Sequence, residues 1–92
     1  HMDPVVTKDE RVKELKEKCQ VILRDVGETL TLHDFRVVFG ETHTNILFDV
    51  VVPHAFGMSD KEVIKLLQEK IWETIGRQYF IVVTIDKPAV KV

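Results

Sequence analysis

Two side chains that can bind a metal ion, His33 and Asp49, stand on either side of a glycine-containing turn at residues 40–42. If a hairpin joins the two flanking segments so that Phe39 faces His43, counting back along both arms places His33 opposite Asp49. Facing residues of an antiparallel pair have Cβ atoms about 4.5–5.5 Å apart, which is close enough to share one ion. Imidazole nitrogen and carboxylate oxygen both suit Zn²⁺ and its neighbours in the first transition row. The spacing therefore predicts part of a metal site at the open end of a hairpin.

Two ligands alone make a weak site, so other groups would have to complete it. The candidates are Asp86 at the end of a third strand, Glu62, His54, or residues of a second subunit. The alternative is structural: a strand-end histidine that only forms a hydrogen bond with the facing carboxylate.

The remaining polar residues of this region have simpler interpretations. His43 and His54 are expected in solvated loops. Asp34 and Arg36 should point away from His33 and form an ion pair or a hydrogen bond at the sheet edge.

Catalysis has no support in the sequence. The four glycines are scattered at positions 27, 40, 57 and 76, so no glycine-rich phosphate loop is present. Ser59 is better explained as a helix cap than as a nucleophile, and no other nucleophile has an evident base. We do not expect an enzyme.

Composition narrows the class of protein further. The 92 residues are enough for one domain, and a hydrophobic content of 45% excludes a disordered chain. Thirteen basic and fifteen acidic side chains give a net charge of −2, so nucleic acid is not an expected partner. No segment approaches the roughly 18 apolar residues of a membrane span, and we expect the chain itself to be soluble. Its single cysteine, Cys19, cannot form an intrachain disulfide and is expected to be a buried small hydrophobe.

Five elements must position these residues. Capping boxes at Thr7-Lys8-Asp9-Glu10 and Ser59-Asp60-Lys61-Glu62 predict two helix starts, and Gly27 and Gly76 predict the corresponding ends. The predicted inward positions recur at steps of three and four: Val12, Leu15, Cys19, Ile22 and Val26 in the first helix, and Val63, Ile64, Leu67, Ile71 and Ile75 in the second, with Trp72 half-buried at the edge.

Three strands are predicted at residues 31–39, 43–52 and 78–86. A right-handed crossover through the second helix allows the third strand to lie parallel to the second. The order αββαβ predicts an α+β fold, a truncated ferredoxin-like sandwich in which a three-stranded mixed sheet has both helices on one face.

Both faces of the hairpin are predicted to be apolar, with Phe35 facing Leu47. The helices can cover only one of them, so a second copy of the chain is expected to cover the other. The predicted faces are His33, Phe35, Val37, Phe39, Leu47, Asp49 and Val51 on one side, and Val38, Ile46, Phe48, Val50 and Val52 on the other.

Three segments, together with the order of the elements, resemble a known family. They are His33-Asp34-Phe35-Arg36, the stretch from Asn45 to Pro53 (NILFDVVVP), and Val83-Thr84-Ile85-Asp86. They are similar to the cytoplasmic C-terminal domain of cation diffusion facilitator (cation efflux) transporters, over a range from Asp3 to about Pro88.

The resemblance implies a domain organisation and a role. Residues 1–2 look like a cloning remnant, residues 3–7 resemble the linker from a transmembrane domain that this chain lacks, and residues 8–92 form the cytoplasmic regulatory and dimerisation domain. Such a homodimer lies at the cytoplasmic face of the cell membrane beneath a transporter that exports zinc or another divalent cation in exchange for protons. Cytosolic metal bound near the dimer interface favours the transport-competent state.

The resemblance also implies metal ligands residue by residue. His33 and Asp86 fall where metal-binding members place a histidine and a carboxylate, Asp49 falls where some have a histidine, and Glu62 matches by a looser alignment. Thr84 stands where the family members with the most metal-binding residues have another histidine, and Lys87 brings a positive charge beside Asp86. We therefore expect one weak Zn²⁺ site per subunit.

Two other functions remain as alternatives. A metal-independent structural dimerisation module would need only the apolar surface. A free-standing metallochaperone would need a Cys-x-x-Cys loop, which a lone Cys19 cannot supply.

Overall fold

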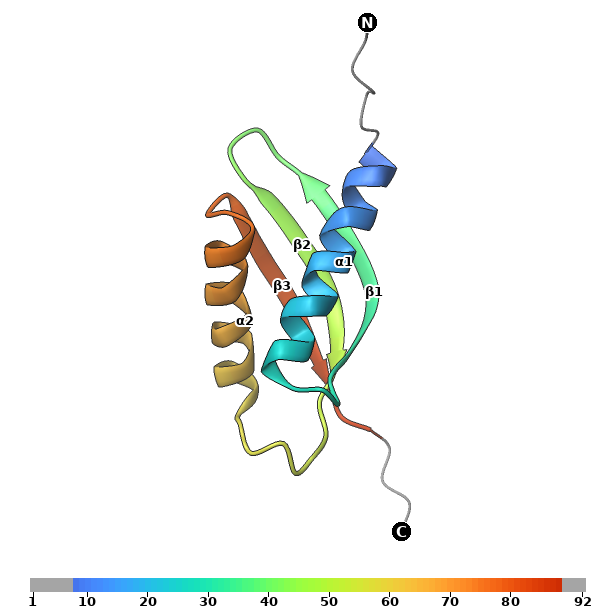
Figure 1. Ribbon diagram of the computed structural model, residues 1–92, viewed down its shortest axis with the longest axis vertical. Helices are drawn as coiled ribbons and strands as arrows, with labels where there is room; N and C mark the ends of the chain where they lie inside the picture. The colour runs from blue at the N-terminus through green and yellow to red at the C-terminus, as the bar shows by residue number, and fades with distance from the viewer. Residues whose placement is uncertain (1–7, 89–92) are drawn as a thin grey trace, which may run out of the picture.

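The computed structural model describes residues 8–88, in the order α1 (Lys8–Val26), β1 (Thr31–Phe39), β2 (Thr44–Val51), α2 (Asp60–Thr74) and β3 (Tyr79–Asp86). The strands form one sheet in the order β1-β2-β3, in which β1 is antiparallel and β3 is parallel to β2. Both helices lie on the same side of the sheet, with α1 crossing in front of it (Figure 1). This architecture confirms the predicted α+β, truncated ferredoxin-like fold. The predicted cap at Thr7, the cloning remnant and the linker lie outside the described residues.

The start of α2 follows from its local sequence. The Ser59 hydroxyl accepts a hydrogen bond from the backbone N–H of Glu62 at 3.2 Å, and a carboxylate oxygen of Glu62 accepts one from the N–H of Ser59 at 3.3 Å. The predicted capping box is therefore confirmed.

The core lies between the helix layer and one face of the sheet. Most of the predicted inward positions are buried there, and Leu23 and Leu30 join them. Four of the predicted inward positions, Val12, Val26, Ile64 and Ile75, are only half-buried. Val26 and Ile75 still pack against the core, whereas Ile64 lines a groove on the surface of α2. The buried apolar residues are Leu15, Cys19, Ile22, Leu23, Leu30, Ile46, Phe48, Val50, Val52, Val63, Leu67 and Ile71.

The hairpin register differs from the prediction at the turn. Phe39 pairs with Thr44 rather than with His43, because the loop contains four residues and closes with a hydrogen bond from the Gly40 N–H to the His43 carbonyl at 3.0 Å. The register near the turn is consequently shifted by one residue, and Arg36, not Phe35, faces Leu47.

A bulge in β1 then reverses this shift. Two residues of β1, Asp34 and Phe35, lie between the pairs at His33 and Arg36, whereas β2 has one residue there. Asp34 has a φ of 53°, in the left-handed region that aspartate tolerates better than most residues do. The pair His33–Asp49 forms as predicted, although the register assumed between it and the turn was wrong.

The bulge also changes which side chains share a face. Phe35 and Val37 turn toward the helices, where the Phe35 ring stacks on Phe48 with centroids 6.0 Å apart. Arg36 lies on the other side with Leu47, the same side as His33, so the predicted separation of Arg36 from His33 was wrong. The predicted hydrogen bond at the sheet edge is present, from the Arg36 guanidinium to the Asp34 carbonyl at 2.9 Å.

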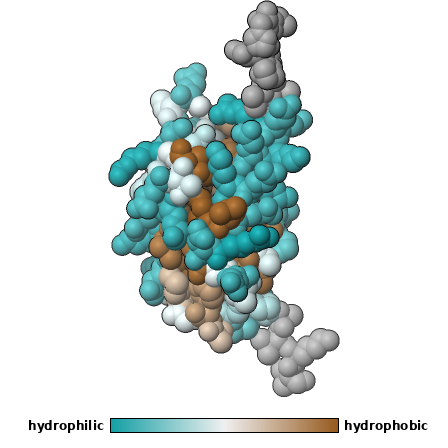
Figure 2. All heavy atoms as spheres, in the orientation of Figure 1, coloured by the Kyte–Doolittle hydropathy of each residue, from teal (hydrophilic) through white to brown (hydrophobic). Residues whose placement is uncertain are grey.

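The two faces of the sheet are covered differently. Figure 2 shows the helix side, which is mostly hydrophilic with apolar atoms concentrated in a strip between the helices and at the loop below them. No element of residues 8–88 covers the opposite side, which we call the open face.

Candidate metal site and open sheet face

The strand pairing arranges the side chains of the open face in four rows across β1, β2 and β3. From the turn end of the hairpin to its open end, the rows are Val38–Asn45–Phe80, Arg36–Leu47–Val82, His33–Asp49–Thr84 and Thr31–Val51–Asp86.

The first two rows are largely apolar. Val38 is 56% exposed, Val82 is 54% exposed and Phe80 is 40% exposed, which makes them three of the four exposed large hydrophobic residues among residues 8–88. The sequence predicted an uncovered apolar face, but it grouped the β1 residues near the turn with the wrong sides of β2, although it grouped His33 correctly with Asp49. The signal for β3 was the alternation from Phe80 to Asp86, which can be assigned to a face only once parallel pairing with β2 is known.

The last two rows contain the predicted ligands. His33 and Asp49 face each other across β1 and β2, and Thr84 continues their row on β3. Asp86 lies in the next row of the same face, so the fold brings His33, Asp49 and Asp86 to one end of the open face. These residues are exposed or half-exposed, as a site that takes up an ion from solvent requires.

The imidazole of His33 has a partner other than Asp49. Its Nε2 lies 3.2 Å from the Thr31 hydroxyl, and within residues 8–88 no hydrogen bond joins His33 to Asp49. The expected structural alternative, a hydrogen-bonded pair, is therefore not formed by these two side chains.

Glu62 does not join the other predicted ligands. It belongs to α2 on the helix side of the sheet, where its carboxylate completes the capping box with Ser59. In a single chain the sheet separates Glu62 from His33, so only a second copy could bring the two together.

Lys87 is also directed away from Asp86. Its ammonium group lies 3.3 Å from a carboxylate oxygen of Asp60, at the start of α2. The positive charge next to Asp86 in the sequence is therefore paired on the helix side, and it does not compete with a cation on the open face.

The two loop histidines occupy opposite ends of the sheet. His54 Nε2 lies 3.0 Å from the Pro88 carbonyl, near the predicted ligands. His43 lies at the turn end, where its Nδ1 is 3.0 Å from the Thr42 hydroxyl and its ring meets Phe80 edge-on at a centroid distance of 5.2 Å.

The donor set of one chain is incomplete for a tightly bound metal. Across residues 8–88, no group of three or more His, Cys, Asp or Glu side chains lies close enough to hold an ion. Cys19 cannot contribute, because it is buried in the core and burial raises the pKa of its thiol to about 12. One chain thus offers a facing pair, His33 and Asp49, with Asp86 nearby, and a complete site would need ligands from a second chain.

Trp72 occupies the half-buried position predicted for it. Its ring packs edge-on against Phe80 at a centroid distance of 5.7 Å, and the Arg77 guanidinium lies 5.9 Å from its centre. Its buried indole N–H has no acceptor in the described part of the chain.

Comparison with known proteins identifies the fold. No protein-family model matches the chain, and a search of curated proteins finds no match. The structure of CzrB, a protein described as a zinc transporter, matches with a TM-score of 0.62 and 16% sequence identity, over 83% of this chain and 95% of the CzrB chain. Neither helix described here is long and apolar enough to cross a membrane. At this identity the likeness shows the fold alone, and the chain therefore shares its fold with the CzrB chain.

Proposed function

We propose that this chain is the cytoplasmic, dimerising and metal-sensing domain of a proton-coupled divalent cation efflux transporter, and that its metal is zinc. The observation that carries the proposal is the facing pair His33 and Asp49 on a sheet face that no element of the described chain covers. The fold shared with CzrB and the resemblance of the strand sequences to cation diffusion facilitators support it.

In this proposal two copies associate through their open faces. The apolar rows containing Val38, Leu47 and Val82 supply the association energy, because apolar area removed from water contributes about 25 cal/mol per Å². The polar rows at the other end then approach those of the second copy. An ion held by His33 and Asp49 gains further ligands from that copy, so metal binding and close association favour each other.

The coupling gives the domain its regulatory role. Metal that binds only the closely associated pair stabilises that arrangement by mass action, and this stabilisation increases with the free metal concentration. A membrane domain attached to each copy would then be held in the transport-competent state when cytosolic zinc is high.

Zinc titration of the variant His33→Ala tests the metal site. We expect calorimetry to show at least a tenfold weaker zinc affinity, and we expect native mass spectrometry to show loss of the zinc-bound dimer. His43→Ala is the matched control, because His43 lies at the opposite end of the sheet, and its affinity should equal that of the wild type. Identical isotherms for His33→Ala and the wild type would contradict the site.

A metal-independent dimerisation module is the second candidate. It is favoured by the absence of a three-ligand group within residues 8–88 and by Thr84 in the row of His33 and Asp49. Native mass spectrometry separates the two functions, because a dimer that stays free of metal with equimolar zinc supports the structural module.

A further inference from the structure

The outer edge of β3 is chemically suited to pair with another strand. From Tyr79 to Ile85 the chain contains no charged residue and no proline. An exposed strand edge of this composition is a template for pairing with a second chain, and proteins usually block such edges. The opposite edge, β1, is interrupted by the bulge at Asp34 and Phe35, which hinders regular pairing there.

The direction of the backbone groups in β3 follows from its pairing with β2. The carbonyls of Gln78 and Asp86 accept hydrogen bonds from Thr44 and Val52, so even-numbered residues of β3 point toward β2. Odd-numbered residues, including Tyr79, Ile81 and Val83, therefore direct their N–H and C=O groups outward.

One side chain of α2 occupies part of this outward edge. The amide nitrogen of Gln68 donates to the Tyr79 carbonyl at 3.0 Å, and the amide oxygen of Gln68 accepts from the Ile81 N–H at 2.9 Å. A single carboxamide thus occupies two outward backbone groups of β3, the Tyr79 carbonyl and the Ile81 N–H, that an added strand would otherwise bond.

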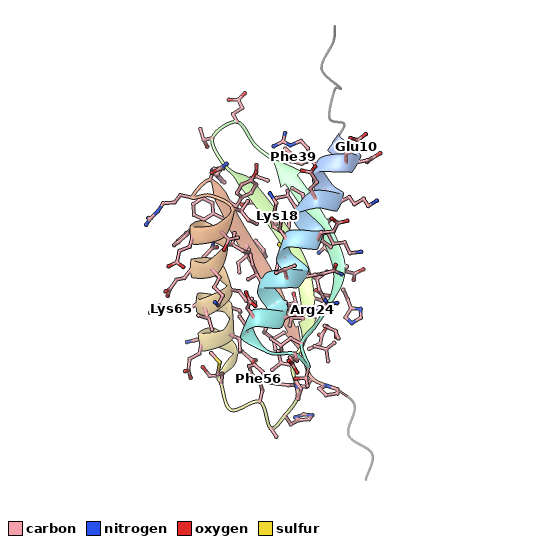
Figure 3. The ribbon with its side chains drawn as sticks, in the orientation of Figure 1. Glu10, Lys18, Arg24, Phe39, Phe56 and Lys65 are labelled. Atoms are coloured by element: carbon pink, nitrogen blue, oxygen red, sulfur yellow. The ribbon has the colours of Figure 1, made fainter. Side chains whose placement is uncertain are left out.

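The surface around Gln68 would otherwise favour such a strand. Ile64 and Trp72 lie one turn before and one turn after Gln68 on α2, and with it they line an apolar groove of about 400 Å³. Lys65, on the rim of the groove, is on the side of α2 that faces away from α1 (Figure 3). A strand added beside β3 would place alternate side chains against this apolar surface.

We propose that the outer edge of β3 is a docking surface for β3 of a second copy of this chain, and that Gln68 keeps it closed. Two copies of β3 related by a twofold axis present the same outward groups to each other, which makes the edge self-complementary. By closing it, Gln68 confines association to the open face. The inference adds to the proposed function, and its test is separate, because a monomeric wild type would overturn the proposed function and leave the effect of Gln68 measurable.

The variant Gln68→Met tests the proposal. Methionine has a similar length and helix propensity but makes neither hydrogen bond. In the variant we expect assemblies larger than those of the wild type in sedimentation velocity, at concentrations at least about tenfold lower than the wild type would need. In dilute solution the Ile81 amide should exchange with deuterium at least about tenfold faster. Gln68→Ala provides the same test should the methionine variant not fold.

Two further variants test whether the extra association depends on Gln68 and on the outer edge of β3. Gln20→Met makes the same substitution at an exposed residue of α1, away from the β3 edge, and should behave as the wild type. In the double variant Gln68→Met/Val83→Pro, the added proline removes an outward N–H of β3, and the extra association should disappear. A folded Gln68 variant with wild-type sedimentation and wild-type Ile81 exchange would overturn the proposal, as would extra association that Val83→Pro leaves unchanged.

Discussion

The two faces of the sheet have opposite relations to the rest of the chain. On the helix side, Ile46, Phe48 and Val50 of β2 are each at most 2% exposed and pack into one continuous core. On the open face, the intervening residues Leu47 and Asp49 are half-exposed, and the face changes from apolar to polar along the strands. The covered face therefore holds the core, whereas the open face leaves large apolar side chains exposed to solvent.

The largest expected difference between the two faces is in the free energy of unfolding that is lost when a side chain is truncated. Phe48→Ala removes a fully buried ring and should lower the free energy of unfolding by about 3–5 kcal/mol. Leu47→Ala, at the preceding residue of the same strand, should lower the free energy of unfolding by less than about 2 kcal/mol at concentrations where the chain is monomeric. Urea denaturation measures both, and equal losses would show that the open face is as tightly packed as the core.

A charge on the open face should disrupt association without unfolding the chain. We expect Val82→Asp to weaken the dimer about a hundredfold or more, because the carboxylate would be buried without a partner. Val21→Asp is the matched control, since Val21 on α1 is 60% exposed and Val82 is 54% exposed. Analytical ultracentrifugation gives both dissociation constants. Equal weakening by the two variants would rule out the open face as the interface.

The bulge that aligns His33 should tolerate glycine but not a β-branched residue. Asp34 has a φ of 53°, and a β-branched side chain in the left-handed region is strained. Asp34→Val should therefore lower the free energy of unfolding by about 1–2 kcal/mol, whereas Asp34→Gly should change it by less than about 1 kcal/mol. A valine variant as stable as the glycine variant would mean that the bulge is not held in this conformation.

The smallest expected effect is a loss of stability at alkaline pH, caused by ionisation of a buried thiol in the core. Burial raises the Cys19 pKa from 9.0 to about 12, so above pH 9 the thiol ionises in the unfolded chain before it does so in the folded one. The stability that the thiol contributes is complete below pH 9 and is lost as pH rises toward 12. The stability advantage of the wild type over Cys19→Ala should shrink by about 1 kcal/mol between pH 8 and pH 10 in urea titrations. A constant difference would place Cys19 in contact with water.

Much of the fold was predictable because its signals are local. The capping box at Ser59 and the apolar stripe of each helix depend on residues within one or two turns. The capping box is confirmed, and so is burial at most positions of the two stripes. The pair His33–Asp49 was also predicted, but its register depends on two features without a local signal. One is the inclusion of His43 in the loop, and the other is the left-handed conformation of Asp34, which is not a glycine. Each feature shifts the hairpin register by one residue, and because the two shifts have opposite directions they cancel at His33.

The surface features were less predictable because they depend on tertiary packing. The sequence of α2 marks Gln68 only as a polar residue beside the apolar stripe, and its hydrogen bonds to Tyr79 and Ile81 require β3 to lie at the sheet edge. Glu62 shows the same limit in reverse. The sequence predicted both helices on one face of the sheet but did not say whether His33 and Asp49 lie on that face or on the other, so it did not reveal that the sheet separates Glu62 from them.

The most direct test of the account is zinc-edge anomalous diffraction from crystals of the chain grown with equimolar zinc. We expect two copies packed through their open faces, with an anomalous peak within about 2.2 Å of a His33 nitrogen and with Asp49 bound to the same ion. Copies packed through their helices, or open faces in contact with no peak at His33, would contradict the claim that this face is a metal-linked dimer interface.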